Sequence, residues 1–527
     1  MAQPILAGVS IKSRWEKLDR DRQPILARAR ECARLTIPSL LPPEGATQHT
    51  KLATPYQGLG ARGVNNLAAR LLLALLPPNN SFFRMRVDDY VIEQLDDKQA
   101  RAEIEKALAA YERAIMTEIE TQAMRVQAFE AIKHLIVTGN GMLFLPDEGG
   151  MRFFRLDQYC VKRDPMGDPI EIVIKESIHP LALPTEVREQ LDIDLDKPEE
   201  VVDLYTMTRL NSEGFWETAQ EVEGIRVPGS EGTYRKDVIP WIPLRWYAID
   251  GEDYGRGYVE EYLGDLKTLE ALTKSLVEFA AVAARIIFLI NPNGTTRAKK
   301  LEKTPNGGFA EGNKDDVSVL QLEKYADFQV VQAVAASIEQ RLSHAFLLMD
   351  SIQRDAERVT AEEIRTMAKQ LEDALGGVYT VLSQEFQLPL VRRIIYQMER
   401  GKRLPALPKD IVKPSIVTGL EALGRGHDLE KLTVFVQALQ PLGQDAIATY
   451  LNVGDYITRV GASLGIDTNG LVRTAEEVAQ MQAQAAMQQM AQQMLPGAAQ
   501  EVVKGMVQED AAQEAASGTA AGRARRG

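Results

Sequence analysis

The sequence predicts a mainly α-helical α+β protein, and three observations support this class. Apolar residues recur at helical spacing from about residue 10 to residue 140. Between residues 142 and 248, short runs of β-forming residues alternate with turn signals, which predicts a small mixed sheet. Two long apolar stripes then flank a polar excursion, which predicts a pair of long helices with a small element at their far end.

The N-terminal helices and the sheet are each predicted by local patterns. The clearest helical stripe has spacings of four, three, four and four, which place five side chains on one face: Ile104, Leu108, Tyr111, Ile115 and Ile119. The runs that predict strands are MLFLP, MRFFRL, EIVIKES, VVDLYTMTRL and GFWETAQEVEG. The turn signals DEGG, DPMGDP, NSEG and VPGSEG separate them, as expected for short strands joined by turns.

The two long helices are predicted at residues 257–290 and 328–348, each by one continuous apolar stripe. Asn291-Pro292 ends the first helix. Neighbouring helices in a bundle are usually joined by loops of about 2–8 residues, whereas about 30 polar, turn-rich residues lie here. We therefore expect a small structured element at the end of a helical stalk.

A glycine pair interrupts a third strong helical pattern, which a capping box at Thr360 and Glu363 begins. Gly376 and Gly377 each cost about 1 kcal/mol relative to alanine in a helix interior. One interpretation is a helix–turn–helix with Gly376 as the C-terminal cap, and the other is a single long helix kinked at the pair. The three/four spacing of apolar residues continues across the pair, which slightly favours the kink.

The C-terminal part of the chain changes in composition. Residues 405–474 have glycine and proline punctuation and predict a compact helical region. From Ala475 the chain is rich in Ala, Gln and Met, and no aromatic residue follows Tyr456. A partial apolar stripe at 478–494 fits two structures: a loose tail, or a helix that needs partners to bury its single apolar face.

Composition and charge exclude several classes of protein. The net charge is −13, whereas a protein that grips nucleic acid by its phosphates is usually basic. Two cysteines, Cys32 and Cys160, exclude a disulfide framework. The N-terminus lacks the pattern of a signal peptide, and the apolar run at 276–290 is shorter than the about 20 residues of a spanning helix. We expect a soluble protein without a membrane segment, made in a cytoplasm.

No motif predicts an enzyme, a cofactor site or a metal site. GLGARG at 58–63 matches the dinucleotide pattern, but no strand precedes it, so a helix entry or tight packing is the better interpretation. GASLG around Ser463 lacks the later histidine that a hydrolase triad needs. DIDLDK at 192–197 has Lys197 where a calcium loop needs glycine. No Walker A sequence and no metal-ligand spacing of histidines and cysteines occurs.

Several stretches resemble the portal proteins, or head-to-tail connectors, of short-tailed bacteriophages of the autographivirus group. The matching stretches are TPYQGLGARGVNNLAARLLLAL (54–75), DGEDYGRGYVEEYLGDLKTLE (250–270), LQLEKYADF (320–328), RVTAEEIRTMAKQLEDALGGVYTVLSQEFQLPLVR (358–392) and TGLEALGRGHDLEKL (418–432). They occur in the family's order and fade in the 185–235 loops and in the tail. The resemblance implies a ring, commonly of twelve copies, at one capsid vertex of the virion, through which DNA is packaged and later ejected.

The parts of this family map onto the segments above. The resemblance implies a wing at 1–256, a stem helix at 257–290, a clip at 291–327, a second stem helix at 328–348, a tunnel loop at 349–359, a kinked wing helix at 360–398, a crown at 399–474 and a C-terminal barrel helix or flexible tail at 475–527. It also implies partners: ring neighbours, double-stranded DNA, the terminase large subunit, a tail adaptor, and scaffolding, major capsid and internal core proteins. Assembly would take place in the host cytoplasm. The alternative is a structural ring without a conduit role, such as a tail adaptor or an internal core protein, which the order stem–clip–stem disfavours.

Three groups of residues are the candidate functional residues. In the clip, the residues that would dock the packaging motor and the tail adaptor are Arg297, Lys299, Lys300 and Lys303. In the tunnel loop, the residues that would face DNA are Gln353, Arg354, Asp355 and Arg358. At the bend of the wing helix, Gly376 and Gly377 would let the helix pass outwards from the channel wall. Without the resemblance, the clip group would be interpreted as solvated surface charge, and the tunnel loop as an ordinary surface turn joining two helices.

Overall fold

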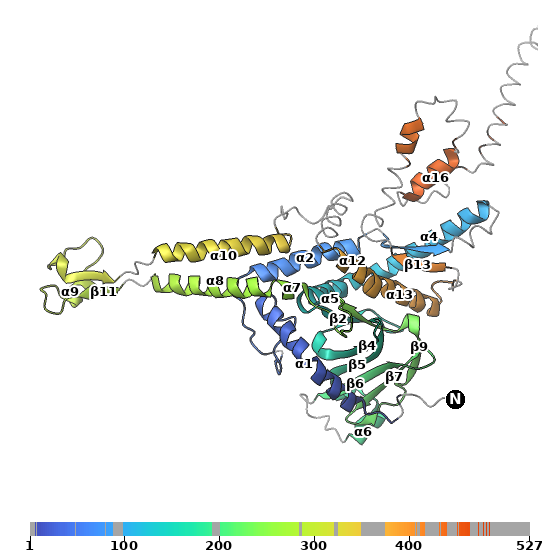
Figure 1. Ribbon diagram of the computed structural model, residues 1–527, viewed down its shortest axis with the longest axis horizontal. Coiled ribbons are helices and arrows are strands. Elements are labelled where there is room, and N and C mark those ends of the chain that lie inside the picture. Colours follow the sequence, from blue (N-terminus) through green and yellow to red (C-terminus); the bar gives the residue numbers. More distant parts are fainter. Residues whose placement is uncertain are drawn as a thin grey trace, which may run out of the picture. The chain divides into compact units, whose positions relative to one another are not determined.

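The computed structural model describes most of the chain up to residue 416 and short stretches beyond it (Figure 1). The described residues are 6, 8–47, 49–78, 81–87, 98–191, 201–283, 287–320, 325–348, 375–405, 407, 412–416, 451, 453–463 and a few positions between 432 and 484. The chain divides into two compact units, Met1–Ala422 and Leu423–Gly527. The fold is α+β and mainly helical, as the sequence predicts.

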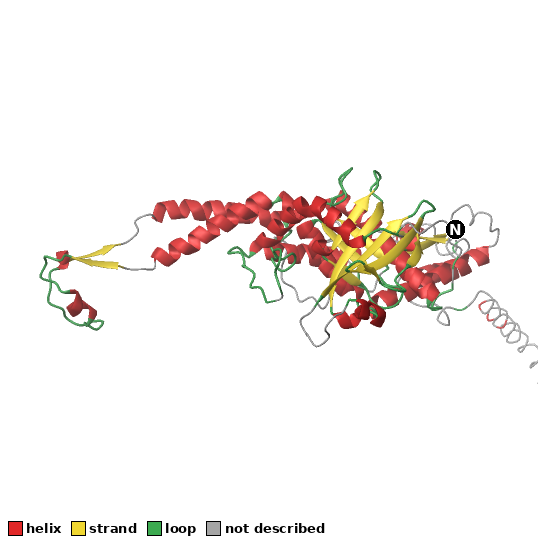
Figure 2. Cartoon of the chain, turned by 90° about the horizontal axis from the view of Figure 1, so that it is seen from below, coloured by secondary structure: helices red, strands yellow, loops and turns green. Residues whose placement is uncertain are grey.

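Two antiparallel sheets form the region between residues 140 and 245 (Figure 2). The first has the order β10-β2-β3, and the second has the order β4-β5-β6-β7-β8, with β9 also paired to β7. Their bounds are β2 (Asn140–Phe144), β3 (Arg152–Phe154), β4 (Tyr159–Arg163), β5 (Pro169–Ile178), β6 (Val202–Leu210), β7 (Phe215–Val222), β8 (Ile225–Arg226), β9 (Gly232–Arg235) and β10 (Trp241–Arg245). Every pair among these strands is antiparallel, so the expectation of a mixed sheet is wrong. Short turns, such as the one between β6 and β7, join only antiparallel neighbours.

Helix α1 (Ile11–Leu35) runs along one face of the six-stranded sheet (Figure 1). Trp15 and Leu18 pack in one cluster with Val173 of β5. The first turn is fixed by the buried Glu221 of β7, whose carboxylate accepts hydrogen bonds from two amides of that turn at 2.9 and 3.1 Å. A carboxylate at a helix N-terminus satisfies unpaired amides and complements the helix dipole, so α1 is held at a defined position on the sheet.

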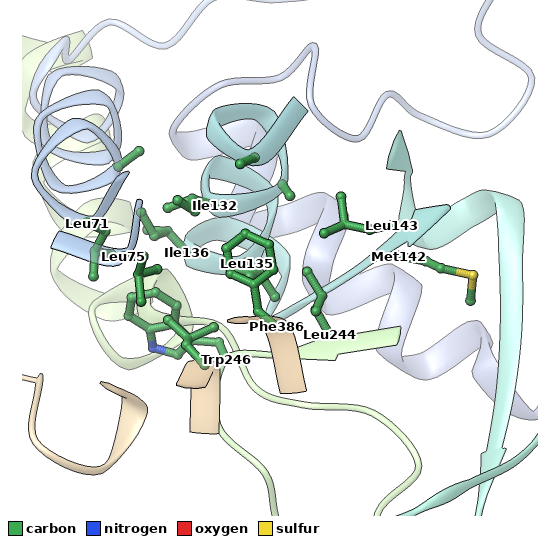
Figure 3. Close-up of a cluster of buried hydrophobic side chains, with 14 of the residues drawn as sticks. Leu71, Leu75, Ile132, Leu135, Ile136, Met142, Leu143, Leu244, Trp246 and Phe386 are labelled. Carbon is green, nitrogen blue, oxygen red and sulfur yellow. The ribbon is translucent and has the colours of Figure 1, made fainter. Parts of the chain in front are cut away.

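The main hydrophobic core lies between α2 (Leu59–Leu75), α5 (Met124–Thr138) and the three-stranded sheet (Figure 3). Side chains from distant parts of the sequence meet there: Leu71, Leu75, Ile132, Leu135, Ile136, Met142, Leu143, Leu244, Trp246 and Phe386. Helix α4 (Lys98–Thr121) adds the predicted apolar stripe to this core. Its buried members are Leu108, Tyr111, Ile115 and Ile119, with Ile104 partly buried beside them.

The GLGARG motif enters α2, and its glycines serve close packing. Gly58 immediately precedes the first residue of the helix. A Cβ atom on Gly60 would lie 2.7 Å from the carbonyl oxygen of Leu35, and one on Gly63 would lie 2.5 Å from the ring of Phe346. Contacts this short exclude larger residues unless the neighbours move. Tight packing, the structural interpretation of this motif, is therefore confirmed.

One strand interrupts the N-terminal region that the sequence predicts to be helical. β1 (Phe83–Val87) pairs with β13 (Val412–Ile416), which lies in a second region predicted to be helical. Phe83 and Met85 are buried, and the amide of Met85 donates to the carboxylate of Glu112 in α4 at 2.7 Å. The prediction of helix is therefore wrong at both β1 and β13. A strand whose partner lies far away in sequence is stabilised by contacts that local periodicity does not show.

The first long helix is shorter than predicted. α7 (Tyr258–Glu261) and α8 (Leu263–Ala283) cover its beginning, but β11 (Ile287–Ile290) takes its end and pairs with β12 (Val317–Leu320). The expected stem helix at 257–290 is therefore wrong at its C-terminal end. The run IIFLI is apolar throughout and rich in β-branched residues, and periodicity cannot distinguish a strand from a buried helix in such a run. α10 (Tyr325–Ala345) begins slightly earlier than predicted and packs along α8 (Figure 1).

The glycine pair lies at a break in the backbone. Gly376 has φ 38° and ψ −106°, outside the helical region, and α12 (Gly377–Leu382) begins directly after it. A π-helical turn, η5 (Ser383–Gln387), continues α12 into α13 (Leu388–Arg400). The residues from the predicted capping box up to residue 374 lie outside the described part of the chain. The choice between a kinked helix and a helix–turn–helix therefore stays a prediction.

The remaining elements are short and connect the larger ones. Within the first unit they are η1 (Leu156–Gln158), η2 (Pro180–Ala182), α6 (Thr185–Gln190) and η3 (Lys236–Val238). In the second unit the structure describes α16 (Val453–Ser463), so the serine of the GASLG motif lies at the end of a helix. The apolar stripe predicted at 478–494 falls outside the described residues, apart from isolated positions.

Candidate functional site

The polar excursion between the two long helices is the first candidate site. It runs from β11 through α9 (Ala298–Glu302) and η4 (Lys314–Asp316) to β12 (Figure 1). The four basic residues of the predicted docking group lie on and beside α9, and all are exposed: Arg297, Lys299, Lys300 and Lys303. The Nζ atom of Lys300 lies 3.1 Å from the carboxylate of Glu311, and an exposed pair of this kind contributes little stability. The structure thus gathers the basic group on one short surface segment.

A cluster of hydrogen bonds joins the two ends of this excursion. Its members are Thr295, Thr296, Asn313 and Asp316, and it is called the polar knot below. The carboxylate of Asp316 accepts hydrogen bonds from the amides of Thr295 and Thr296 at 2.9 and 3.0 Å, and from both threonine hydroxyls. These bonds, the Thr296 amide first among them, lower the pKa of Asp316. Gly294 faces the same carboxylate, where a Cβ atom would lie 2.3 Å from it. Thr296 also exchanges hydrogen bonds with the backbone of Asn313, so the knot joins both arms of the excursion.

The excursion has almost no hydrophobic core of its own. Among residues 291–318, all of them described, Thr296 has the one buried side chain, whereas Phe309 is fully exposed in a glycine-rich loop. Exposing an aromatic ring to water is unfavourable, and aromatic anchors carry much of the energy of protein interfaces. The exposed ring of Phe309 is therefore available for contact with another protein.

The helix pair α8 and α10 is the second candidate, because it exposes apolar residues away from its own packing face. The inner face is well packed, with the rings of Phe279 and Phe328 at a centroid distance of 4.7 Å. Its buried aliphatic members are Leu266, Leu269, Ile338 and Leu342. The exposed apolar side chains of the pair are Val277, Val282, Val330 and Val334. Apolar surface of this kind is available for contact with a neighbouring chain.

The candidate tunnel-loop residues lie outside the described part of the chain. They are Gln353, Arg354, Asp355 and Arg358, within a segment from 349 to 374 that the structure does not describe. Their roles therefore stay predictions. The structure does describe the point from which this segment departs, since α10 ends at Ala345 and the backbone continues to Leu348.

A buried ion cluster at the π-helical turn is not predicted by the sequence patterns. The carboxylate of Glu385 in η5 accepts hydrogen bonds from the amide and the Nε atom of Arg245 in β10 at 3.1 and 2.9 Å. Arg163 of β4 lies 3.9 Å from the same carboxylate. Burial lowers the pKa of Arg163, and the charge of Glu385 opposes that shift. The cluster thus joins the helical segment after Gly376 to both sheets. Sequence patterns could not predict it, because a single glutamate in a helical pattern does not show which distant arginine it pairs with.

The described residues offer no site of obvious chemistry. No group of His, Cys, Asp and Glu among them could hold a metal ion. None of the described helices is both long and apolar enough to cross a membrane. A cleft of about 440 Å³ is lined by Tyr234, Tyr396 and Arg400, among others, but the guanidinium of Arg400 already pairs with Asp147.

Comparisons with known proteins identify the family. A family model described as "Bacteriophage head to tail connecting protein" matches residues 9–472. The portal protein of Escherichia phage T7 is 44% identical over 492 residues, which cover 92% of each chain. The portal protein of Enterobacteria phage SP6 is 32% identical over 482 residues, 90% of this chain and 92% of the relative. A solved structure titled "Neck of empty GTA particle computed with C6 symmetry" is 13% identical and covers 72% of this chain and 86% of its own, with a TM-score of 0.38. At that level the structural likeness carries no weight in the assignment.

The family match spans most of the chain, and the curated relatives are matched over nearly their whole length. The function is that of a phage portal protein, a structural connector between head and tail in the virion. Portal proteins form oligomeric rings at a capsid vertex. The chain belongs to the bacteriophage head-to-tail connecting proteins, the family of the phage portal proteins.

Proposed function

We propose that the chain forms a ring, commonly of twelve copies, and that double-stranded DNA enters and leaves the head through its central channel. Besides the family membership, the helix pair α8 and α10 supports this proposal. The two helices pack against each other on one face and expose four valines on their other faces. A stem helix pair between two ring neighbours needs apolar surface on its outer sides. The ring would act as a structural conduit without a catalytic site, a cofactor or a membrane, and would assemble in the host cytoplasm.

The acidic charge of the chain supports a conduit that does not hold its cargo. Twelve copies at −13 each would carry about −156. Tight binding of DNA comes from lysine and arginine contacts that neutralise phosphates, which an acidic channel lacks. Electron microscopy of the purified protein tests the proposal directly. Rings with an open axial hole are expected, and open filaments or discs without a hole would contradict it.

The same proposal assigns the other parts of the chain. The strand at β11 shortens the first stem helix, so the stem comprises α8 and α10, and the clip comprises residues 287–320. The remaining proposed parts are a wing at 1–256, a tunnel loop at 349–359, a kinked wing helix at 360–398, a crown at 399–474 and a barrel or tail at 475–527. The proposed partners are the terminase large subunit and the tail adaptor, which dock in turn at the clip, and scaffolding, major capsid and internal core proteins.

A set of substitutions in the clip tests the proposed docking surface. Replacing all four exposed basic residues with serine should leave rings intact but weaken binding of both the terminase large subunit and the tail adaptor. The residues are Arg297, Lys299, Lys300 and Lys303. A matched control removes four exposed basic residues from the sheet region of the proposed wing: Arg152, Lys162, Arg235 and Lys236. Unchanged affinity of the clip variant for both partners, measured on assembled rings, would remove the docking assignment.

A further inference from the structure

The end of α10 is fixed by a complete set of hydrogen bonds, some of which come from outside the helix. Backbone amides of residues 346–348 donate to three of its last carbonyls, those of Leu342, Ser343 and His344. The hydroxyl of Tyr258 donates to the carbonyl of Ala345 at 2.8 Å. The side-chain amide of Asn66 donates to the carbonyls of Phe346 and Leu347 at 3.0 and 3.1 Å. Every carbonyl from residue 342 to residue 347 therefore has a donor, although a helix end normally leaves such groups unpaired.

Helix α2 contributes a second contact to the same place. The ring of Phe346 is fully buried, and Gly63 faces it so closely that a Cβ atom there would lie 2.5 Å away. Gly63 and Asn66 are three residues apart, so they lie on one face of α2. The rings of Tyr258 and Tyr262 enclose Phe346 from the stem side, at centroid distances of 5.7 and 5.9 Å. One face of α2 thus receives both the ring and the carbonyl groups that follow α10.

The backbone at this point has an unusual conformation. Leu347 has φ 54°, in the left-handed region that leucine rarely adopts. Such a conformation persists when surrounding contacts determine it. The side-chain amide of Asn66 donates to two carbonyls that flank this residue: that of Phe346, which precedes it, and that of Leu347 itself. The side chain of Asn66 therefore fixes the direction in which the chain leaves α10.

We propose that Asn66 is a positioning residue for the segment that begins at residue 349, so that α2, and not the stem helices alone, sets the base of the channel loop. This inference rests on the proposed channel role of residues 349–359, in which Arg354 and Arg358 face DNA and the loop helps to retain it when packaging ends. Helix α2 is itself embedded in the main core through Leu71 and Leu75. A displacement of α2 in the body of the protein is thus transmitted to the loop base through two hydrogen bonds and one buried ring.

The test uses full-length protein with Asn66→Ala and Asn66→Asp, because the aspartate has the same shape but no N–H group to donate to a carbonyl. The matched control is Asn65→Ala, since Asn65 is the exposed neighbour on the same helix. The Tyr258→Phe variant removes the other side-chain donor and keeps the ring. Two quantities are measured: hydrogen exchange of the amides at 346–348 in assembled rings, and leakage of DNA from filled heads.

Both Asn66 variants should exchange these amides about ten-fold faster than the parent and should leak DNA, whereas Asn65→Ala should do neither. The double variant Arg354→Ala and Arg358→Ala separates this inference from the proposed function. If that double variant leaks while the Asn66 variants retain DNA, the positioning role is wrong. If the double variant retains DNA, the channel role of the loop is wrong, and exchange at 346–348 alone decides: faster exchange supports Asn66 as the positioning residue, and exchange equal to Asn65→Ala overturns it.

Discussion

Replacing Glu385 with alanine should strongly destabilise the first unit, because the change removes the anion that pairs with the buried guanidinium of Arg245 and lies 3.9 Å from that of Arg163. The side chains of Arg245 and Arg163 are 8% and 4% exposed, and that of Glu385 is 17% exposed. Removing one partner of a buried ion pair costs about 3–5 kcal/mol, since the remaining charge stays buried without compensation. The amide of Arg245 also loses its acceptor. We expect a loss of about 4 kcal/mol for Glu385→Ala and a smaller loss for Glu385→Gln, which keeps an acceptor oxygen.

The loss should appear as a lower melting temperature in differential scanning calorimetry of the full-length chain at neutral pH. For a cooperative unit spanning Met1–Ala422, an unfolding entropy of about 2.1 cal/mol/K per residue converts about 4 kcal/mol into a decrease of about 4–5 °C. Glu311→Ala is the control, because it breaks an exposed pair with Lys300 and should melt like the parent. A Glu385→Ala chain that melts within about 1 °C of this control would refute the reasoning, since the two arginines would then be adequately solvated without Glu385.

Four further predictions concern other parts of the chain. Gly63→Ala places a methyl group against Phe346 and should cost about 1–3 kcal/mol by overpacking, which calorimetry measures and Phe346→Leu should partly reverse. Burial lowers the pKa of His134, so the unfolded chain binds that proton first as the pH falls, and the stability contributed by the neutral imidazole is lost below about pH 6.5. The melting temperature of His134→Gln should accordingly fall less than that of the parent when the pH is lowered through this range. An equal fall in the two melting temperatures would contradict this prediction. Asp316→Ala should open the polar knot, with faster hydrogen exchange at the Thr296 amide; an unchanged rate would show that the knot does not order the clip. The isolated peptide 475–527 should show little helix by circular dichroism, because its apolar stripe is too narrow for a stable isolated helix, and strong helicity in dilute solution would oppose this.

Helical periodicity predicted the elements whose cause is local. The stripe in α4 is confirmed because a helix that covers a core must present apolar residues every three or four positions. The GLGARG motif was correctly interpreted as packing, yet the sequence could not show that Gly63 receives Phe346, because the two residues are far apart along the chain. The clip could be located as a polar excursion between two stripes, and its basic residues lie on an exposed surface segment as expected.

Features that depend on distant partners could not be predicted in this way. The strand β1 needs β13, and the carboxylate of Glu385 needs Arg245, and neither pairing leaves a mark on the local pattern. The prediction of helix at β11 is wrong for a different reason, because an apolar run rich in β-branched residues suits either a helix or a strand. The role of Asn66 has no sequence signal at all, since the local pattern does not show the distant carbonyls to which its side chain donates.

The pairing of β1 with β13 has a consequence for synthesis on the ribosome. About 325 residues separate the two strands, so at about 5–20 residues per second β1 waits roughly 16–65 s for its partner to be made. During that interval Phe83 and Met85 belong to an unpaired edge, which is a template for association with other chains. The nascent chain therefore carries this open edge until β13 has been made. A chain truncated before Val412 keeps this edge open, so we expect prematurely terminated chains to aggregate or be degraded before they can enter an assembly.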